Sequence, residues 1–209
     1  MAKVNDGQLA PGLLIASPPL GDPNFDRTVV LLALHGDTGA LGFVVNRIAP
    51  VSLGELLSFA GYGDVGSGDE SPVFVGGPVQ PSSGWIVCHD EALGGDKSGV
   101  IEVGEHLRVT SSRSAFDALA RDVGDRRAAE KDRGAEPGRD DKRRIVLLGY
   151  SGWGPGQLEG EIAVGAWLPV PLDEQVLFDV AIDDRWERAY ALLGITPAGT
   201  MSMRSIGEA

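Results

Sequence analysis

The sequence predicts a mixed α/β fold, and three observations support this prediction. Short apolar runs bounded by Gly, Pro, Asp and Asn alternate with segments in which apolar residues recur every three to four positions. The chain has 209 residues, of which 43% are hydrophobic, so it can bury a sizeable core as one large or two small domains. No internal repeat or clear linker divides it. We therefore expect a single domain over residues 1–209.

The first half begins with elements that have clear limits. Residues 12–16 (GLLIA) predict a short buried strand, which the following prolines end. Residues 27–35 are too uniformly apolar for one wet face and predict a strand buried on both faces. Residues 41–46 predict its antiparallel partner across a glycine-containing turn. Ser52 and Glu55 form a capping box, which predicts a helix to about residue 60.

The remaining elements follow from the same patterns. Apolar spacing predicts one helix capped by Ser114 and a last helix capped by Asp183 or Asp184 and ended by Gly194. Further expected strands are residues 72–75, 84–89, 100–103, 107–110, 145–148, 166–170 and 175–180.

One charged segment stands out between these elements. Residues 121–144 contain nine of the eighteen Lys and Arg residues, together with seven acidic residues. This mixture leaves little to bury, so we expect a solvated helix extension followed by a flexible loop, an insertion at about 122–143. An arm that binds nucleic acid is the alternative, although it would contain fewer acidic residues.

A glycine-rich corner follows the strand expected at residues 145–148. We expect Gly154 to cap a helix that begins at Pro155, with the Gln157 side chain reaching back to the N–H of the cap. Glu159 lies close enough to the start of this helix to favour its dipole. The corner either only sets how the strand enters the helix, or its N–H groups hold an anion or a ligand carbonyl.

The residues do not spell out a reaction. Residues 149–153 nearly match the G-x-S-x-G nucleophile motif, but the last position is Trp153, so we do not expect Ser151 to be a nucleophile. Glu159 and Glu161 would point about 200° apart on a helix and cannot act as a pair. Phosphate loops and H-x-x-x-H pairs are absent from the sequence, so we expect no catalytic residue, metal or cofactor.

Charge and cysteine content suggest a location and a class of partner. The net charge of −12 opposes non-specific binding to nucleic acid or to anionic membranes. Cys88 is the only cysteine, which suits a reducing compartment. The first residues lack the basic and apolar regions of a secretory signal. We expect a cytoplasmic protein that binds neither membrane nor nucleic acid directly. The sequence does not assign its oligomeric state.

Polar residues at the ends of strands and in the corner are the candidates for binding a ligand, because ligands in sheet proteins often bind beside strand ends. They are Ser17, His35, Asn46, Arg47, Gly76, Gly77, Gln157 and Glu159. The alternative is that His35 is a structural residue, that Asn46 caps a turn and that Arg47 is solvated.

Several motifs together resemble the YqgE/AlgH family. They are GLLIASP at 12–18, Phe25 with TVVLL at 28–32, His35, GFVVNR at 42–47, VFVGGPV at 73–79, GYSGWGPGQLEGEI at 149–162, Trp167, Phe178 with Asp179, and Trp186. They extend in order over nearly the whole chain. Ser151 departs from the small apolar residue that is usual in the family, and residues 121–143 look like a longer insertion.

This resemblance implies a bacterial cytosolic protein with one α/β domain, in which helices flank a mixed, largely antiparallel curled sheet similar to a pseudo-barrel. It supplies a label as a transcriptional regulator, linked with alginate production in some bacteria, and no established reaction. We expect a non-enzymatic regulatory or interaction protein that acts through a protein partner. The alternatives are a small-ligand-binding protein or undiscovered enzyme that uses the strand-end residues, and a DNA-binding protein.

Overall fold

The computed structural model describes residues 9–89, 99–133 and 143–196, and the chain within these ranges forms two compact units. Unit 1 is built from residues up to Arg47, residues 75–81 and residues from Gly149 onward. Unit 2 is built from residues 48–74 and 82–148. The prediction of a single domain stays a prediction.

Antiparallel strands form the centre of unit 1. Its strands β1 (Gly12–Ala16), β2 (Val29–Gly36) and β3 (Gly39–Val44) are joined by β10 (Trp167–Pro171) and by the end of β9 (Ile145–Trp153). They pair in the order β10, β1, β2, β3, β9, and each of these pairings is antiparallel. The hairpin predicted from residues 27–35 and 41–46 is confirmed, with Val30 opposite Val44.

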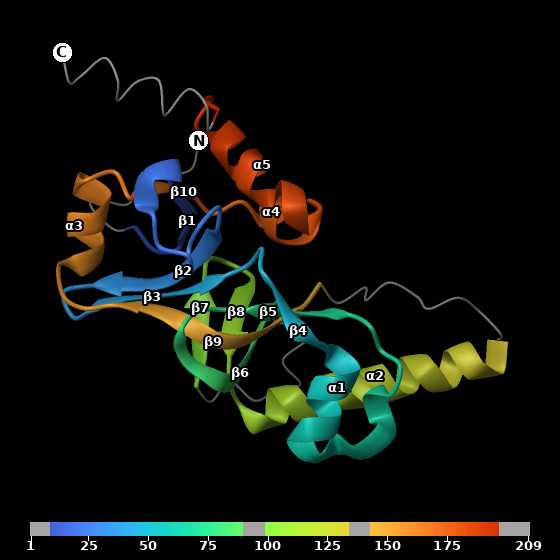
Figure 1. Ribbon diagram of the computed structural model, residues 1–209. Coiled ribbons are helices and arrows are strands. Elements are labelled where there is room, and N and C mark those ends of the chain that lie inside the picture. Colours follow the sequence, from blue (N-terminus) through green and yellow to red (C-terminus); the bar gives the residue numbers. More distant parts are fainter. Residues whose placement is uncertain (1–8, 90–98, 134–142, 197–209) are drawn as a thin grey trace, which may run out of the picture. The chain divides into compact units, whose positions relative to one another are not determined.

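Helices cover these strands. The first is α3 (Gln157–Ala163), and the others are α4 (Glu174–Phe178) and α5 (Arg185–Leu192), with short turns η1 (Pro18–Leu20) and η5 (Ile182–Asp184). Figure 1 shows α3 on one side of β1 and β10, and α4 with α5 on the other. Helix α3 contacts β10 and β3, whereas α5 contacts β1 and β2. Both faces of the central strands are therefore covered.

The core of unit 1 explains why its strands read as continuous apolar runs. Every residue of β1 is buried, and so are the first five residues of β2, as predicted. Leu34 is an exception at 48% exposure. One face packs into a cluster around two tryptophans, whose members are Leu14, Ala16, Val30, Leu32, Val44, Trp153, Leu158 and Trp167.

Unit 2 combines short strands with one long helix. It contains β4 (Ile48–Ser52), β5 (Pro72–Val75), most of β6 (Val79–His89), β7 (Val100–Val103), β8 (Leu107–Thr110), and helices α1 (Leu53–Leu57) and α2 (Arg113–Arg133). Strand β8 lies between β6 and β7, and both pairings are antiparallel. A turn in two parts, η2 (Ser58–Tyr62) and η3 (Gly63–Gly66), connects α1 to the rest of the unit, and Figure 1 shows these turns beside α2.

The capping box predicted at the start of α1 is present in the structure. Ser52 accepts a hydrogen bond from the N–H of Glu55, and the Glu55 carboxylate accepts one from the N–H of Ser52, so the predicted capping box is confirmed. The α-helix ends at Leu57, and the turn η2 follows it to Tyr62.

Residues 175–180 were predicted to form a strand, and this prediction is wrong. They belong largely to helix α4, because the Asp173 carboxylate accepts a hydrogen bond from the N–H of Gln175 and caps the helix. Val176 and Leu177 are both buried. A short apolar run of this kind does not distinguish a strand from a buried helical turn, and the cap was the signal that decided it.

The start of the corner helix also differs from its prediction. Gly156 has a φ of +71°, in the left-handed region, so the helix begins at Gln157 and not at Pro155. The contact expected of Gln157 is nevertheless present, because its side-chain oxygen accepts a hydrogen bond of 3.0 Å from the N–H of Gly154. Pro155 and Gly156 therefore form a turn that the Gln157 side chain closes.

The charged segment begins as helix. Residues 122–133 continue α2, which agrees with the expected helix extension. Arg144 is only 2% exposed and pairs with Asp122 at 2.8 Å, and Arg127 donates to the carbonyls of Asp64 and Val65. These side chains anchor the helix to unit 2 and are not simply solvated. The expected flexible loop falls on residues 134–142, outside the described residues.

The antiparallel pairing and the flanking helices confirm the mixed α+β class. Within the described ranges, no helix is long and apolar enough to cross a membrane.

Candidate functional site

Asn46 and Arg47 stabilise the loop that precedes β2. The Asn46 side chain accepts a hydrogen bond from the N–H of Val29 and donates one to the carbonyl of Arg27. The Arg47 guanidinium donates to three carbonyls, those of Pro23, Asn24 and Asp26. Arg47 is half-buried, and its charge neutralises the partial charges of a turn whose carbonyls converge.

Ser17 and the glycine pair Gly76–Gly77 are also bound within unit 1. Ser17 Oγ donates to the carbonyl of Gly165 at 2.6 Å. The carbonyl of Gly76 accepts from the N–H of Val44 and from Ser151 Oγ. Gly77 packs so closely on the backbone of β9 that a Cβ there would clash with Tyr150. Ser151 itself is fully buried inside a strand, a poor position for a nucleophile.

His35 and Glu159 come together from distant parts of the chain. The His35 Nε2 lies 3.0 Å from a carboxylate oxygen of Glu159, and the imidazole side chain is 9% exposed while the carboxylate is 51% exposed. The pKa of Glu159 is lowered, mainly by a hydrogen bond from its own backbone N–H and further by His35. The pair ties β2 to the first turn of α3.

Glu161 lies on the other side of α3, as the 200° estimate predicted. One carboxylate oxygen accepts hydrogen bonds from the indoles of both Trp153 (2.9 Å) and Trp167 (2.8 Å). The other oxygen accepts from Gln157. Phe25 packs against both tryptophans, at 6.4 and 5.3 Å between ring centroids. The carboxylate therefore fixes an aromatic cluster and has no free oxygen of its own for chemistry.

The eight sequence candidates thus fall into separate structural contacts of unit 1. Their polar side chains bond to backbone groups, to each other or, for Gln157, also to Glu161. That they bind a ligand stays a prediction.

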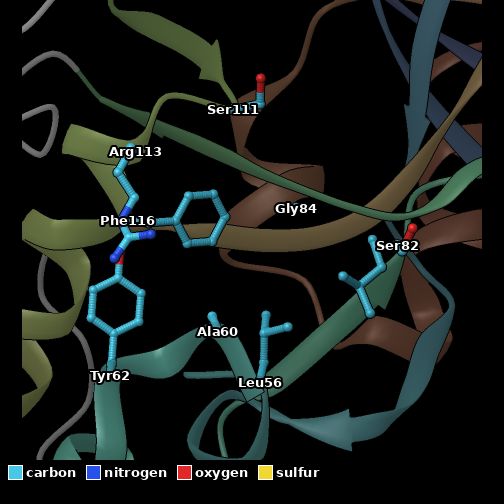
Figure 2. A pocket seen from close by; sticks show the side chains of 9 residues that line it. Leu56, Ala60, Tyr62, Ser82, Gly84, Ser111, Arg113 and Phe116 are labelled. Carbon is cyan, nitrogen blue, oxygen red and sulfur yellow. The ribbon is translucent and has the colours of Figure 1, made fainter. Parts of the chain in front are cut away.

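An open cavity lies in unit 2, and none of the eight candidates is among its lining residues. It has a volume of about 280 Å³. Its lining residues come from α1 and the turn after it, from β6, from α2 and the segment before it, and from β9: Leu56, Ala60, Tyr62, Ser82, Gly84, Ser111, Arg113, Phe116 and Leu148. We call it the α2 pocket. Figure 2 shows the Phe116 ring near its middle, with Leu56 and Ala60 on one side.

Arg113 supplies the only formal charge among these lining residues. Its Nε donates to the Asp117 carboxylate at 3.1 Å, and its guanidinium carbon lies 5.0 Å from the centre of the Tyr62 ring. The Tyr62 hydroxyl donates to the same carboxylate oxygen at 2.7 Å. Figure 2 shows Arg113 directly beside Tyr62. The guanidinium is therefore held from two sides.

The protonation equilibria of this group reflect these contacts. The hydrogen bonds from Tyr62 and then Arg113 lower the pKa of Asp117. Burial, followed by the hydrogen bond to Asp117, raises the pKa of Tyr62. At neutral pH the group consists of a cationic Arg113, an anionic Asp117 and a neutral phenol.

The sequence did offer one signal for this pocket. Arg113 is the first residue of α2, and the first turn contains no acidic residue. A cation at this end opposes the helix dipole, although its i,i+4 ion pair with Asp117 supports the helix. No group of three or more His, Cys, Asp or Glu side chains that could hold a metal was found within the described part of the chain.

Comparisons with known proteins agree with this fold. The family model described as AlgH-like matches residues 13–198. A UPF0301 protein of Anaeromyxobacter sp. strain Fw109-5 is 41% identical over 197 residues, covering 91% of each chain. A UPF0301 protein of Xanthomonas campestris pv. campestris strain B100 is 41% identical over 191 residues, covering 90% of each.

A solved structure has the same fold. The solution structure of the AlgH protein from Pseudomonas aeruginosa matches with a TM-score of 0.72 and 31% identity, covering 94% of each chain. The similarity extends over both units, so the fold described above is that of these relatives.

Proposed function

The chain belongs to the AlgH-like family, and from this premise we propose that it is a non-enzymatic regulatory or interaction protein of the bacterial cytoplasm. The observation that supports this proposal is the engagement of its polar side chains. Catalysis needs a nucleophile, base or acid within reach of a substrate. In unit 1, Ser17, Asn46 and Arg47 are instead hydrogen-bonded to backbone carbonyls or N–H groups.

A regulatory role would act through a protein partner and not through direct contact with DNA. The net charge is −12, and proteins that bind DNA need a cationic footprint that displaces counterions. Arg126, Arg127 and Arg144, which belong to the most basic segment, contact groups of unit 2 itself.

Two measurements test this proposal. Pure protein is incubated with a metabolite panel and followed by NMR, and its binding to labelled duplex DNA is measured at 50 and 200 mM salt. We expect neither turnover nor DNA binding. A turnover that is lost in His35→Ala would contradict the non-enzymatic assignment, and DNA affinity that falls steeply with salt would contradict the need for a protein partner.

A second candidate function, binding of a small ligand, is favoured by the α2 pocket. Its volume of about 280 Å³ lies just below the range of about 300–1,000 Å³ that is usual for ligand pockets. Apolar residues line most of it, with one oriented guanidinium at its edge, which is the usual composition of such sites. The position differs from the strand-end residues of unit 1 that the sequence suggested.

A thermal-shift screen with a matched variant tests this second function. A ligand that binds the native state raises the melting temperature by mass action. We expect a hit with the natural sequence that is lost in Ser82→Trp, which places an indole at an exposed position of the pocket lining. A hit that persists in Ser82→Trp but disappears in Asn46→Ala would move the site to unit 1.

A further inference from the structure

The lining of the α2 pocket divides into an apolar part and one cationic edge. Leu56, Ala60, Phe116 and Leu148 provide the apolar part, and Arg113 provides the edge. Phe116 reaches under Gly84, where a Cβ would lie 2.7 Å from the ring. The glycine therefore leaves room for the ring, whose exposed part is available to an apolar group of a ligand.

The guanidinium of Arg113 is oriented but retains donors. Its Nε donates to Asp117, and the guanidinium also interacts with the Tyr62 side chain. Because a guanidinium carries five N–H donors, these two contacts leave donors on the terminal amino groups for a ligand. The Tyr62 ring supports one face of the guanidinium. Because Arg presents its N–H donors in a rigid planar fork, this arrangement is suited to a carboxylate that approaches from the pocket.

The charges limit what the pocket accepts. A single guanidinium faces it, and Asp117 offsets part of that charge. The whole chain carries −12, so a ligand with several negative charges would be repelled at long range. A neutral acceptor would make weaker hydrogen bonds to the terminal amino groups than an anion does, and a cation would be repelled by the charge of Arg113. An anion with one charge and an apolar body satisfies both parts of the lining.

We propose that the α2 pocket binds a small amphipathic monocarboxylate. Its carboxylate accepts hydrogen bonds from the terminal amino groups of Arg113, and its apolar body packs against Phe116 and Leu56. This inference rests on the ligand-binding function proposed for the pocket and adds the chemical class of the ligand.

Three probes of one shape and different charge test it: 3-phenylpropionate, 3-phenylpropanol and 3-phenylpropylamine. Each is titrated into the ¹⁵N-labelled full chain at neutral pH, and amide shifts are followed. We expect saturable shifts in residues 56–62 and 113–116. 3-Phenylpropionate should bind at least about tenfold more tightly than the alcohol, which corresponds to one good charge-assisted hydrogen-bond pair. The amine should bind most weakly.

Matched variants identify the residue that gives this preference. Arg113→Gln should lower the affinity for 3-phenylpropionate to that for the alcohol. Arg121→Gln is the same change on the same helix outside the lining, and it should leave the tenfold preference intact. Arg113 is 73% exposed, so its replacement should not unfold the chain. Arg113→Lys should retain only part of the preference, because the fork is lost.

The outcomes separate the ligand class from the function of the pocket. Equal affinities of 3-phenylpropionate and 3-phenylpropanol for the pocket would overturn the carboxylate inference but would still support the proposal that the pocket binds a ligand. Binding of none of the probes, or tightest binding of the amine, would overturn the inference outright. Shifts confined to unit 1 would overturn its location. None of these results would contradict the proposed regulatory or interaction role.

Discussion

Units 1 and 2 use their polar side chains in different ways. In unit 1 the residues at strand ends hold loops and helices by bonding to backbone carbonyls, as Arg47 does with three of them. Around the α2 pocket, side chains of unit 2 bond mainly to one another, as Tyr62, Asp117 and Arg113 do. The first arrangement leaves few groups for a ligand, and the second orients a charged group beside an open cavity.

Polar residues at strand ends are therefore ambiguous indicators of function. Asn46 and Arg47 fit the position of a binding site, yet their partners are Val29, Arg27 and the loop before them. Arg113 lies in an ordinary polar stretch but has more N–H donors than its contacts with Asp117 and Tyr62 use. The number of donors that the fold has already used distinguishes these cases better than position does.

The largest effect expected from this difference is at a tight backbone contact of unit 1. Gly149 has a φ of +71°, and a Cβ there would lie 2.5 Å from the carbonyl of Gly77. Gly149→Ala should lower the free energy of unfolding by about 3 kcal/mol or more, through backbone strain and overpacking. Urea denaturation measures this. Gly160→Ala, in α3 with open space around it, should instead stabilise by about 0.5–1 kcal/mol; equal losses in both variants would contradict the close contact.

Glu161 offers a somewhat smaller test in the same unit. Glu161→Ala leaves the indoles of Trp153 and Trp167 without their acceptor. The expected loss is about 2–3 kcal/mol, because unsatisfied buried donors cost about 1–3 kcal/mol each. Glu161→Gln keeps one carbonyl oxygen for both indoles and should lose less than half as much. Unfolding followed by tryptophan fluorescence compares them, and identical losses would show that the acceptor oxygen is unimportant.

In unit 2 the expected effect depends on burial of the ion pair. Asp122→Asn removes a charged partner of Arg144, which is 2% exposed, and should cost about 2 kcal/mol because an ion pair with a nearly buried guanidinium is lost. Asp117→Asn removes the partner of Arg113, which is 73% exposed, and should leave the urea midpoint nearly unchanged. A reversed order would contradict the view that the pocket group serves binding more than stability.

The smallest effect concerns the pKa of Asp117. Tyr62→Phe removes the strongest cause of its lowered pKa, so the pKa of Asp117 should rise towards the ordinary value of a carboxyl. A carboxyl whose pKa is lowered by folding contributes stability above its unfolded pKa and loses that contribution as the pH falls through its folded pKa. The free energy of unfolding of the variant should therefore depend less on pH below about 4. Carbon-detected NMR titration of the Asp117 side chain measures the shift, and an unchanged pKa would place its cause elsewhere.

Local chemistry explains which parts of the fold were predictable. The capping box of Ser52 and Glu55 and the reach of Gln157 to Gly154 depend on residues three positions apart, so they can be read from the chain. The prediction of a strand at 175–180 was wrong because a local signal was overlooked. The Asp173 cap favours a helix more strongly than the apolar residues Val176 and Leu177 favour a strand. The hairpin β2–β3 was predictable because its turn is short.

The candidate site was hardly predictable, because it depends on contacts between distant residues. Tyr62 and Asp117 are separated by 55 positions and meet only after η2 and α2 are placed within unit 2. Likewise, nothing near His35 in sequence indicates that Glu159, 124 positions away, is its partner. The helix dipole argument at Arg113 was the one available clue, and it indicates an unusual residue without indicating a cavity.

The division of the chain has a consequence for its synthesis. The chain passes between the units at 47/48, 74/75, 81/82 and 148/149, and β1 pairs with β10 from the other end of the chain. Strands β1, β2 and β3 therefore leave the ribosome long before β10, the partner of β1, has been synthesised. Ser17 likewise bonds to the carbonyl of Gly165, which lies 148 positions later in the chain. Such long-range pairing slows folding and leaves apolar strands uncovered in the meantime. Truncation at any of these four boundaries should yield aggregates, and the nascent chain should depend on chaperones until residue 171 has emerged.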